Sequence, residues 1–360
     1  MSMPRTSAFL AMLGLMIGVV GCRKEDPSAP ENTEGPTPLA LHLPSWMLAD
    51  TFYIPVVQGT SPLTVEGVAL GRALFYETAL SNDQTMSCAT CHVQANAFSD
   101  PRQFSVGTDG SLGRRNAPAI MNPIYDTAFF WDGRAPSLEH QAFGPVTNPV
   151  EMANSWAVVV DRLEQDPTYP GMFQAAFGTA DIDSVRIVQA IAQFERTLLS
   201  FDSRFDRWYY GGDSTQLTQQ EQRGFDLFMG EAQCADCHTP PLFHDVSFRN
   251  IGLHGQLSDL GVEEVTGLMD DRWRFKTSTL RNIEVTAPYM RDGRFTTLEE
   301  VVDFYADDVE VNMPNLDPHM FPWSLGQIEL DPQERADLVA FMRTLTDASF
   351  LSDPDLGPPF

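Results

Sequence analysis

Apolar residues recur at intervals of three and four along several stretches of this chain, which is the spacing of one face of an α-helix. One such helix is predicted over residues 65–75, with Thr64 as its capping residue. Others are predicted over residues 184–201, directly after Thr218, and over residues 332–345. The pattern predicts a mostly α-helical protein.

The first 60 residues follow another pattern. Arg5 precedes an apolar run, residues 8–20, that is too short to span a bilayer, and a small residue and Cys22 follow it. This arrangement predicts a signal peptide over residues 1–21 and resembles a lipoprotein signal, in which Cys22 carries the lipid. An ordinary signal peptide with an incidental cysteine is the alternative, and both imply a periplasmic protein. Residues 22–60 are then a tether and N-terminal extension, and its polar, Pro-rich part up to about residue 45 is expected to be unfolded.

The remaining sequence contains an internal repeat. Three motifs are found in both halves and in the same order: Gly-x-x-Leu-Phe from Gly71 and Gly224, Arg-Asn at 115–116 and 281–282, and Asp-Gly-Arg-x-x-[Ser/Thr]-Leu-Glu from Asp132 and Asp292. Such an order indicates duplication of one structural unit. We therefore expect one domain over residues 61–213 and a second over residues 214–360.

Each half also contains one Cys-x-x-Cys-His motif, formed by Cys88, Cys91 and His92 and by Cys234, Cys237 and His238. This motif attaches a c-type haem through two thioether bonds, and its histidine ligates the haem iron. A redox disulfide or half of a zinc site is the alternative for a lone Cys-x-x-Cys pair. Here each pair is followed at once by histidine in an exported chain. The sequence thus predicts two cytochrome-c-like helical domains, each holding one covalent haem.

The chain is strongly acidic, with 49 Asp and Glu against 23 Lys and Arg and a net charge of −26. Nucleic acid is therefore excluded as a partner. The charge either steers a basic redox protein or only keeps the protein soluble, and solubility is the favoured interpretation.

The repeat predicts a difference between the two haem sites. Aligning the Asp-Gly-Arg motifs pairs Leu138 with Leu298, and seven residues later Pro145 is paired with Tyr305. Proline cannot ligate iron, whereas the phenolate of tyrosine can. One haem would then be open and the other capped by Tyr305. The helical spacing of Tyr305 fits core packing equally well, so both interpretations stay open at this point.

Three further residues are candidates for peroxide chemistry at an open haem. Cleavage of a peroxide needs a group that moves a proton between its two oxygens, and Glu151 in an apolar pocket would have the raised pKa that suits this task. Gln141 would orient the peroxide or a water molecule. Trp131 would pass electrons between the haems. The alternatives are a loop carboxylate, a surface helix residue and a core aromatic.

Several segments together resemble the bacterial di-haem cytochrome c peroxidase family, which includes MauG. Besides the haem motifs, the segments that carry the resemblance over about residues 60–346 are 115–118, 130–134, 141–145, 148–152, 280–282 and 286–289. The resemblance implies that the haem of His92 is peroxidatic and that the haem of His238 receives electrons. It places Gln141 and Glu151 beside the first haem and Trp131 between the two. It also implies a calcium ion held by Asn116 and the carbonyls of Thr286 and Pro288, since oxygen ligands suit this cation.

Two departures from the typical peroxidases of the family are evident. Residues 93–113 contain neither the distal histidine of those enzymes nor a methionine, and Tyr305 stands where they have a methionine ligand. MauG shares both departures.

The sequence therefore predicts a peroxidase that reduces hydrogen peroxide to water with electrons from a small cytochrome or copper protein. A MauG-like oxidase that acts on a protein or another substrate is the first alternative. A non-catalytic electron-transfer cytochrome with two closed haems is the second. The interpretation leaves room for a homodimer and for attachment to a membrane through lipid on Cys22.

Overall fold

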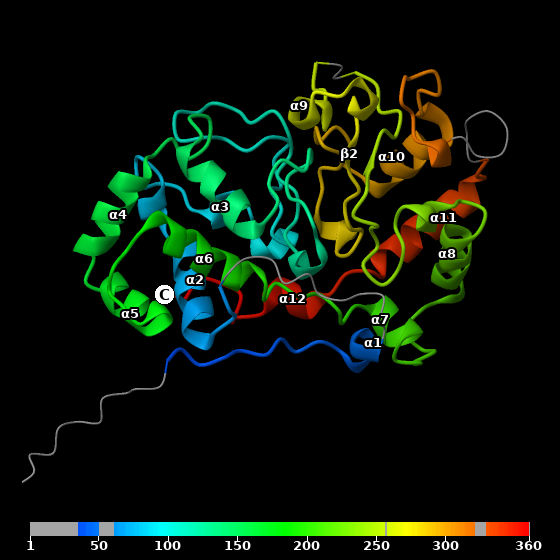
Figure 1. Ribbon diagram of the computed structural model, residues 1–360. Helices are drawn as coiled ribbons and strands as arrows, with labels where there is room; N and C mark the ends of the chain where they lie inside the picture. The colour runs from blue at the N-terminus through cyan, green and yellow to red at the C-terminus, as the bar shows by residue number, and fades with distance from the viewer. Residues whose placement is uncertain (1–34, 50–60, 256–257, 321–328, 360) are drawn as a thin grey trace, which may run out of the picture. The chain divides into compact units, whose positions relative to one another are not determined.

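Two pairs of crossed helices build the two halves of the computed structural model, which describes residues 35–49, 61–255, 258–320 and 329–359. In one half α2 (Val65–Phe75) packs against α6 (Ser184–Glu195), and in the other α8 (Gln219–Met229) packs against α11 (Pro332–Arg343) (Figure 1). The prediction of a mostly helical protein is confirmed. The predicted signal peptide and Cys22 lie outside the described residues.

The predicted helix starts are present because side chains cap the free backbone N–H groups there. Thr64 Oγ1 accepts a hydrogen bond from Gly67 N at 3.0 Å. Thr218 and Glu221 form a capping box at the start of α8, in which Glu221 Oε2 accepts from Thr218 N at 2.7 Å. The end of α6 differs from the prediction of residue 201. After Glu195 the chain tightens, and Leu198 donates to the carbonyl of Glu195 at 3.0 Å.

The first repeated motif has a packing reason. A Cβ atom on Gly71 would fall on the carbonyl oxygen of Ala190 in α6, and a Cβ atom on Gly224 would fall on that of Asp337 in α11. Each pair of helices therefore crosses so closely that only glycine fits at the crossing. The same crossing in both halves is direct evidence for the duplication.

We expect Gly224→Ala to destabilise the protein by about 1–3 kcal/mol, because α8 and α11 must move apart to admit the methyl group. Urea unfolding of the haem-loaded protein, followed by far-UV circular dichroism, measures this change. Gly171→Ala in α5 (Tyr169–Phe177) is the matched control, since nothing lies within 4 Å of its Cβ position. It should leave stability unchanged or raise it by up to about 1 kcal/mol. Equal effects of the two substitutions would contradict the packing argument.

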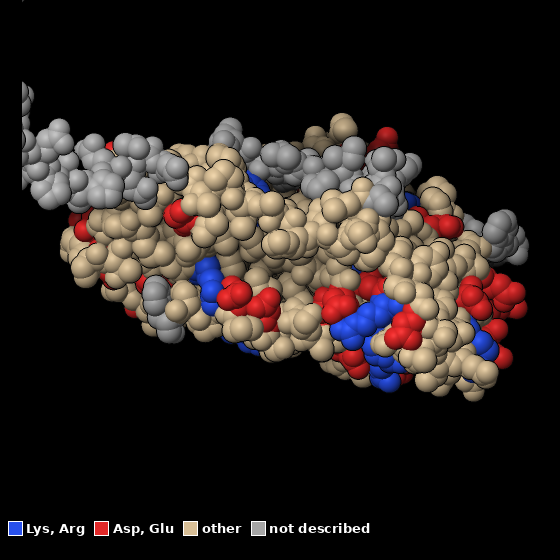
Figure 2. All heavy atoms as spheres, turned by 90° about the horizontal axis from the view of Figure 1, so that it is seen from below, with Lys and Arg blue, Asp and Glu red and all other residues tan. Residues whose placement is uncertain are grey.

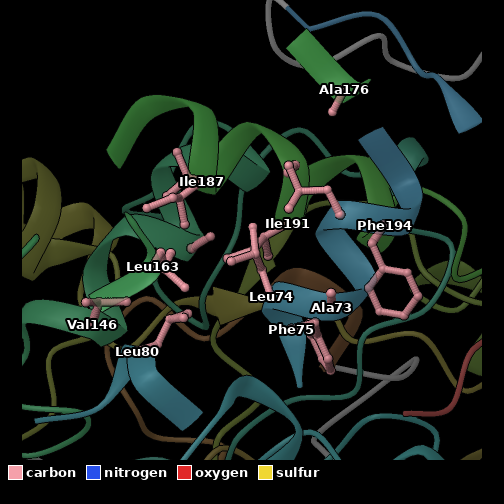
Figure 3. Packing of buried hydrophobic residues seen from close by; sticks show 14 of the residues in the cluster. Ala73, Leu74, Phe75, Leu80, Val146, Leu163, Ala176, Ile187, Ile191 and Phe194 are labelled. Carbon is pink, nitrogen blue, oxygen red and sulfur yellow. The ribbon is translucent and has the colours of Figure 1, made fainter. Parts of the chain in front are cut away.

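A separate hydrophobic cluster fills each half. In the first, Leu74 and Ile191 lie among buried apolar side chains, and the rings of Phe75 and Phe194 meet edge to face at 5.3 Å (Figure 3). In the second, the ring of Phe341 packs against those of its neighbours, with centroids 5.1 Å from Phe228 and 5.7 Å from Phe205. Phe341 lies one turn after Asp337, the α11 residue that Gly224 meets. Phe194 likewise lies one turn after Ala190, the α6 residue that Gly71 meets, so the two cores are built alike.

The structure revises one part of the repeat. Asn282 has φ +55° and starts a short helical turn, and the residue with this conformation in the first half is Asn122 with φ +52°, not Asn116. Asn122 N donates to Leu198 O at 2.7 Å, and Asn282 N donates to Leu345 O at 3.0 Å. The Arg-Asn pairs therefore match in letters but not in position.

The other elements connect and cover these helices. They are α1 (Ser45–Ala49), α3 (Leu138–Thr147), α4 (Trp156–Gln165), α7 (Arg204–Tyr209), α9 (Glu263–Thr266), α10 (Leu298–Asp303), α12 (Ala348–Ser352) and the antiparallel strands β1 (Phe248–Arg249) and β2 (Phe275–Lys276). After α11 the chain returns to the first half. There the ring of Phe350 lies 5.6 Å from that of Phe98, and Tyr76 Oη donates to Leu356 O at 2.8 Å.

Residues 35–45, expected to be part of an unfolded tether, pair with the first half. Leu39 N donates to Leu63 O and Val65 N donates to Thr37 O, both at 2.9 Å. These bonds satisfy backbone groups that composition alone would leave in water. In α1, Trp46 then stacks on Tyr210 with ring centroids 3.9 Å apart.

The face drawn in Figure 2 carries acidic and basic side chains side by side and large neutral areas between them. Arg204 is ion-paired with Glu221 and Arg207 with Asp202. Among the described residues, no helix has the length and apolar character that crossing a membrane requires.

Candidate active site

One cavity of about 1020 Å³ receives residues from both halves. Its volume slightly exceeds the usual range for ligand pockets, which is about 300–1,000 Å³. Every site residue that the sequence predicted contributes to its wall: Cys88, Cys91, His92, Asn116, Trp131, Gln141, Glu151, Cys234, Cys237, His238, Thr286, Pro288 and Tyr305. The structure thus brings together groups that are far apart in the chain.

The two Cys-x-x-Cys-His motifs fold into the same local turn. His92 N donates to Cys88 O at 2.9 Å, and His238 N donates to Cys234 O at 2.8 Å. This turn brings both thiols and the imidazole of each motif to the cavity. None of the four cysteines forms a disulfide.

Backbone carbonyls orient both imidazoles. His92 Nδ1 lies 2.7 Å from Phe98 O, and His238 Nδ1 lies 3.0 Å from Phe243 O. A carbonyl can only accept, so the proton is on Nδ1 and Nε2 keeps a free lone pair. Burial lowers the pKa of both histidines, which favours this neutral form. Each ring is therefore prepared to ligate iron through Nε2.

These features fit a covalent haem in each half. The thiols stay protonated without one, because burial raises the pKa of Cys234 to about 12 and that of Cys237 to about 11. Burial likewise raises the pKa of Cys88 and Cys91. In the described ranges, no three His, Cys, Asp or Glu side chains gather into a metal cluster, so the zinc alternative has no support there.

Glu151 follows α3 in a turn that is bonded back onto this helix. Met152 N donates to Pro145 O at 3.2 Å, and Thr108 N from the preceding loop donates to Glu151 O at 3.0 Å. Asn148 Nδ2 donates to Glu151 Oε1 at 2.6 Å. Burial raises the pKa of the Glu151 carboxyl, although Asn148 and Arg134 oppose this. The side chain can therefore hold a proton at its other oxygen, Oε2.

Gln141 and Pro145 lie one turn apart on α3, and both reach the cavity. Ser137 caps this helix, as Thr297 caps α10 in the second half. Because α3 and α10 begin at equivalent capping residues, the structure supports the pairing of Pro145 with Tyr305 that the sequence predicted. Proline offers the cavity neither a ligand nor a donor.

Tyr305 lies in an irregular helical turn. The helical spacing of Tyr305 in the sequence fits an ordinary α-helix, but α10 ends at Asp303 and a π-helix, Phe304–Asp308, follows. π-helical turns are rare in proteins, and many of those that occur lie at functional sites. Phe304 is buried in the core, whereas Tyr305 lines the cavity beside Met290 and Met320. Burial raises the pKa of the Tyr305 phenol.

Trp131 links the two Asp-Gly-Arg motifs through Asn116. Its indole Nε1 donates to Asn116 O at 2.8 Å, while Asn116 N donates to Arg291 O at 2.8 Å. Arg291 is the counterpart of Trp131 in the second half. The side-chain amide of Asn116 donates to Arg102 O at 2.9 Å. Trp131 thus lines the cavity where the two halves meet.

Sequence reasoning missed Glu195, which also lines the cavity and is 3 % exposed. It ends α6 one residue after the core residue Phe194. The sequence signal that could have revealed it is a glutamate directly after the apolar residues of a predicted buried helix.

Comparison with known proteins agrees with this geometry. Residues 65–215 match the family model described as di-haem cytochrome c peroxidase. The chain is 42% identical to the methylamine utilization protein MauG of Methylorubrum extorquens over 79% of each chain. It is 35% identical to the cytochrome c551 peroxidase of Nitrosomonas europaea over 81% of this chain and 84% of that one.

A solved structure supports the same relationship. It is a MauG-like protein associated with microbial copper homeostasis, with 36% identity and a TM-score of 0.77 over 85% of this chain and 97% of that one. The resemblance predicted from sequence is confirmed. The chain therefore belongs to the di-haem cytochrome c peroxidase family of oxidoreductases, whose members carry two c-type haems.

Proposed function

We propose that the protein reduces hydrogen peroxide to water at the first haem site, next to His92. Electrons enter through the second site, next to His238, from a small cytochrome or copper protein. The observation that carries this proposal is the difference between the halves. A half-buried carboxyl that can hold a proton, Glu151, lies in the first half, where Pro145 takes the place of Tyr305.

Reduction of one peroxide consumes two electrons and two protons and yields two water molecules. When bound, the haems supply redox-active iron for the electron transfers. The chain's own residues bind the reactants and move the protons. His92 and His238 hold the iron centres through Nε2, and the four thiols fix the rings covalently.

Glu151 is the proposed acid–base of this reaction. It takes a proton from one peroxide oxygen at Oε2 and gives it to the other, so that the departing oxygen leaves as water. Asn148 holds the opposite carboxyl oxygen in place. Gln141 on α3 orients the peroxide with its side-chain amide, and Trp131 passes electrons between the halves.

Steady-state oxidation of a reduced cytochrome or copper protein by peroxide tests the proposal. Two molecules of a one-electron donor should be oxidised for each peroxide consumed. No peroxide-dependent oxidation of either class of donor would refute it.

Tyr305 is proposed to ligate the second haem through its phenolate. We expect Tyr305→Phe to remove the low-spin ferric EPR signal of that haem, because phenylalanine has no ligand atom. Tyr289→Phe is the matched control, since Tyr289 also lines the cavity but its hydroxyl donates to Ile283 O at 2.9 Å. An unchanged signal in the Tyr305 variant would exclude it as a ligand.

A second candidate is a MauG-like oxidase. The absence of histidine and methionine from residues 93–113, together with Tyr305, favours it. Peroxide-driven oxidation of a protein side chain, with only slow turnover of every reduced donor, would identify this activity.

We further propose a first domain over residues 61–213 and a second over residues 214–360. The separate hydrophobic clusters support this division. Export to the periplasm, lipid on Cys22 and a homodimer remain predictions. Calcium also remains one, and it is supported by the oxygen-rich set of Asn116 and the carbonyls of Thr286 and Pro288 at the cavity wall.

A further inference from the structure

Glu195 places a buried carboxyl in the wall of the first haem site. Its Oε2 has no hydrogen-bond partner in the described part of the chain, and the residue is 3 % exposed. A buried polar atom without a partner is costly, so such a group is retained for a reason other than packing.

The repeat shows that packing does not require a carboxyl at this place. Glu195 follows Phe194, and Met342 follows the equivalent Phe341 of α11. Both side chains line the cavity. An apolar methionine therefore packs at the equivalent position of the second half. Only the half that contains Glu151 has a carboxyl there.

Among the described residues, none forms an ion pair with Glu195. Arg196 is ion-paired with Glu139 of α3. The charged side chains of α2 are bonded elsewhere, since Glu66 accepts from Thr37 and Arg72 donates to the C-terminal backbone.

Burial is the largest influence on Glu195 and raises its pKa to about 8, while Arg196 opposes this and Glu139 adds to it. At neutral pH the side chain is thus mainly the neutral acid. Glu195 and Glu151 also both raise the pKa of the Cys88 thiol, so both carboxyls lie in the neighbourhood of this cysteine.

We propose that Glu195 is a proton store for the first haem site and recharges Glu151 through water in the cavity. The proposal rests on the peroxidase function. When its proton has moved to the departing oxygen, Glu151 is deprotonated again, and the other peroxide oxygen still needs two protons and two electrons to become water. Each of these protons follows one route: the O–H bond of Glu195 breaks, an O–H bond forms on Glu151, and Glu151 passes the proton on to this oxygen. Glu195 then regains a proton from solvent, and the electrons come from the donor protein.

Infrared spectroscopy of the resting haem-loaded enzyme tests the store without turnover. The wild type should show a carboxylic-acid C=O band at pH 7 that disappears as the pH rises through about 8. The wild-type-minus-Glu195→Gln difference spectrum should contain this band, whereas the wild-type-minus-Glu164→Gln spectrum, the exposed control on α4, should not. Subtraction removes any band of Glu151, because both proteins contain this residue. A wild-type-minus-Glu195→Gln spectrum without the band at pH 7 overturns the proposal, whether or not the enzyme reduces peroxide.

Turnover provides the second readout. We expect Glu195→Gln to lower kcat by about tenfold at pH 7, less than the loss of a direct proton donor, with an unchanged KM for peroxide. The wild type and the variant should converge above about pH 8, where Glu195 has lost its proton. Glu195→Met, which installs the side chain of the second half, should behave like Glu195→Gln and retain both haems. Wild-type kcat in either variant at pH 7 overturns the proposal.

Discussion

Glu151→Gln is expected to lower peroxide turnover by about 10²–10⁴-fold, the contribution typical of a positioned general acid–base. Glutamine keeps the size of the side chain and an oxygen that accepts from Asn148, but it cannot carry the proton. Both haems should stay attached, because the thiols and imidazoles are unchanged. Steady-state peroxide reduction and the haem absorbance of the purified variant measure the two outcomes.

The exposed Glu164 of α4 supplies the control for this substitution. Glu164→Gln removes the same charge from the protein and should leave turnover at the wild-type value. Full activity of Glu151→Gln would remove Glu151 from the mechanism. Loss of haem from that variant would show that it has a structural role instead.

Arg281→Met is expected to destabilise the haem-loaded protein by about 3–5 kcal/mol, because it leaves a buried carboxylate without its partner. Arg281 is 0 % exposed and donates from both terminal nitrogens to Asp206 at 2.9 Å. Its Nε donates to Pro241 O at 2.8 Å. Urea unfolding at pH 7, followed by circular dichroism, measures the loss.

The pH dependence of this loss has a definite sign. Burial alone would raise the pKa of Asp206, but the charge and hydrogen bonds of Arg281 outweigh it and hold this pKa below its usual value. The pair therefore stabilises the wild type above the unfolded pKa of about 3.9, and this stability is lost as the pH falls through the folded value. The difference between wild type and variant should shrink in acid.

An exposed ion pair provides the comparison. The side chains of Arg343 and Glu299 are 51% and 55% exposed, so Arg343→Met should change stability by only about 0–1 kcal/mol. A loss for Arg281→Met as small as that of Arg343→Met would contradict the role assigned to the buried pair. Adding Asp206→Leu to Arg281→Met should recover part of the loss, since no unpaired charge then remains.

Local sequence signals predicted much of the fold. Thr64 and Thr218 fix helix starts through bonds to residues three positions away, which a short stretch of sequence contains. The haem motifs were readable for the same reason, because two thiols and an imidazole must be close in sequence to hold one ring.

The misjudged features depend on distant contacts. Asn116 was aligned with Asn282 because both follow an arginine. The backbone shows Asn122 as the counterpart of Asn282, since its N–H donates to Leu198 O after α6 as that of Asn282 donates to Leu345 O after α11. The helical spacing of the sequence likewise did not reveal the π-helix at Tyr305 or the tightening after Glu195. Docking of residues 35–45 likewise needs Leu63 and Val65 to be in place first.

The return of the chain to its first half has a consequence for biosynthesis. Phe350 and Leu356 belong to the hydrophobic cluster of the first half, yet they are synthesised after all of the second half. The first core therefore stays incomplete until the second half has been made. Fragments that end near residue 213 should accordingly misfold.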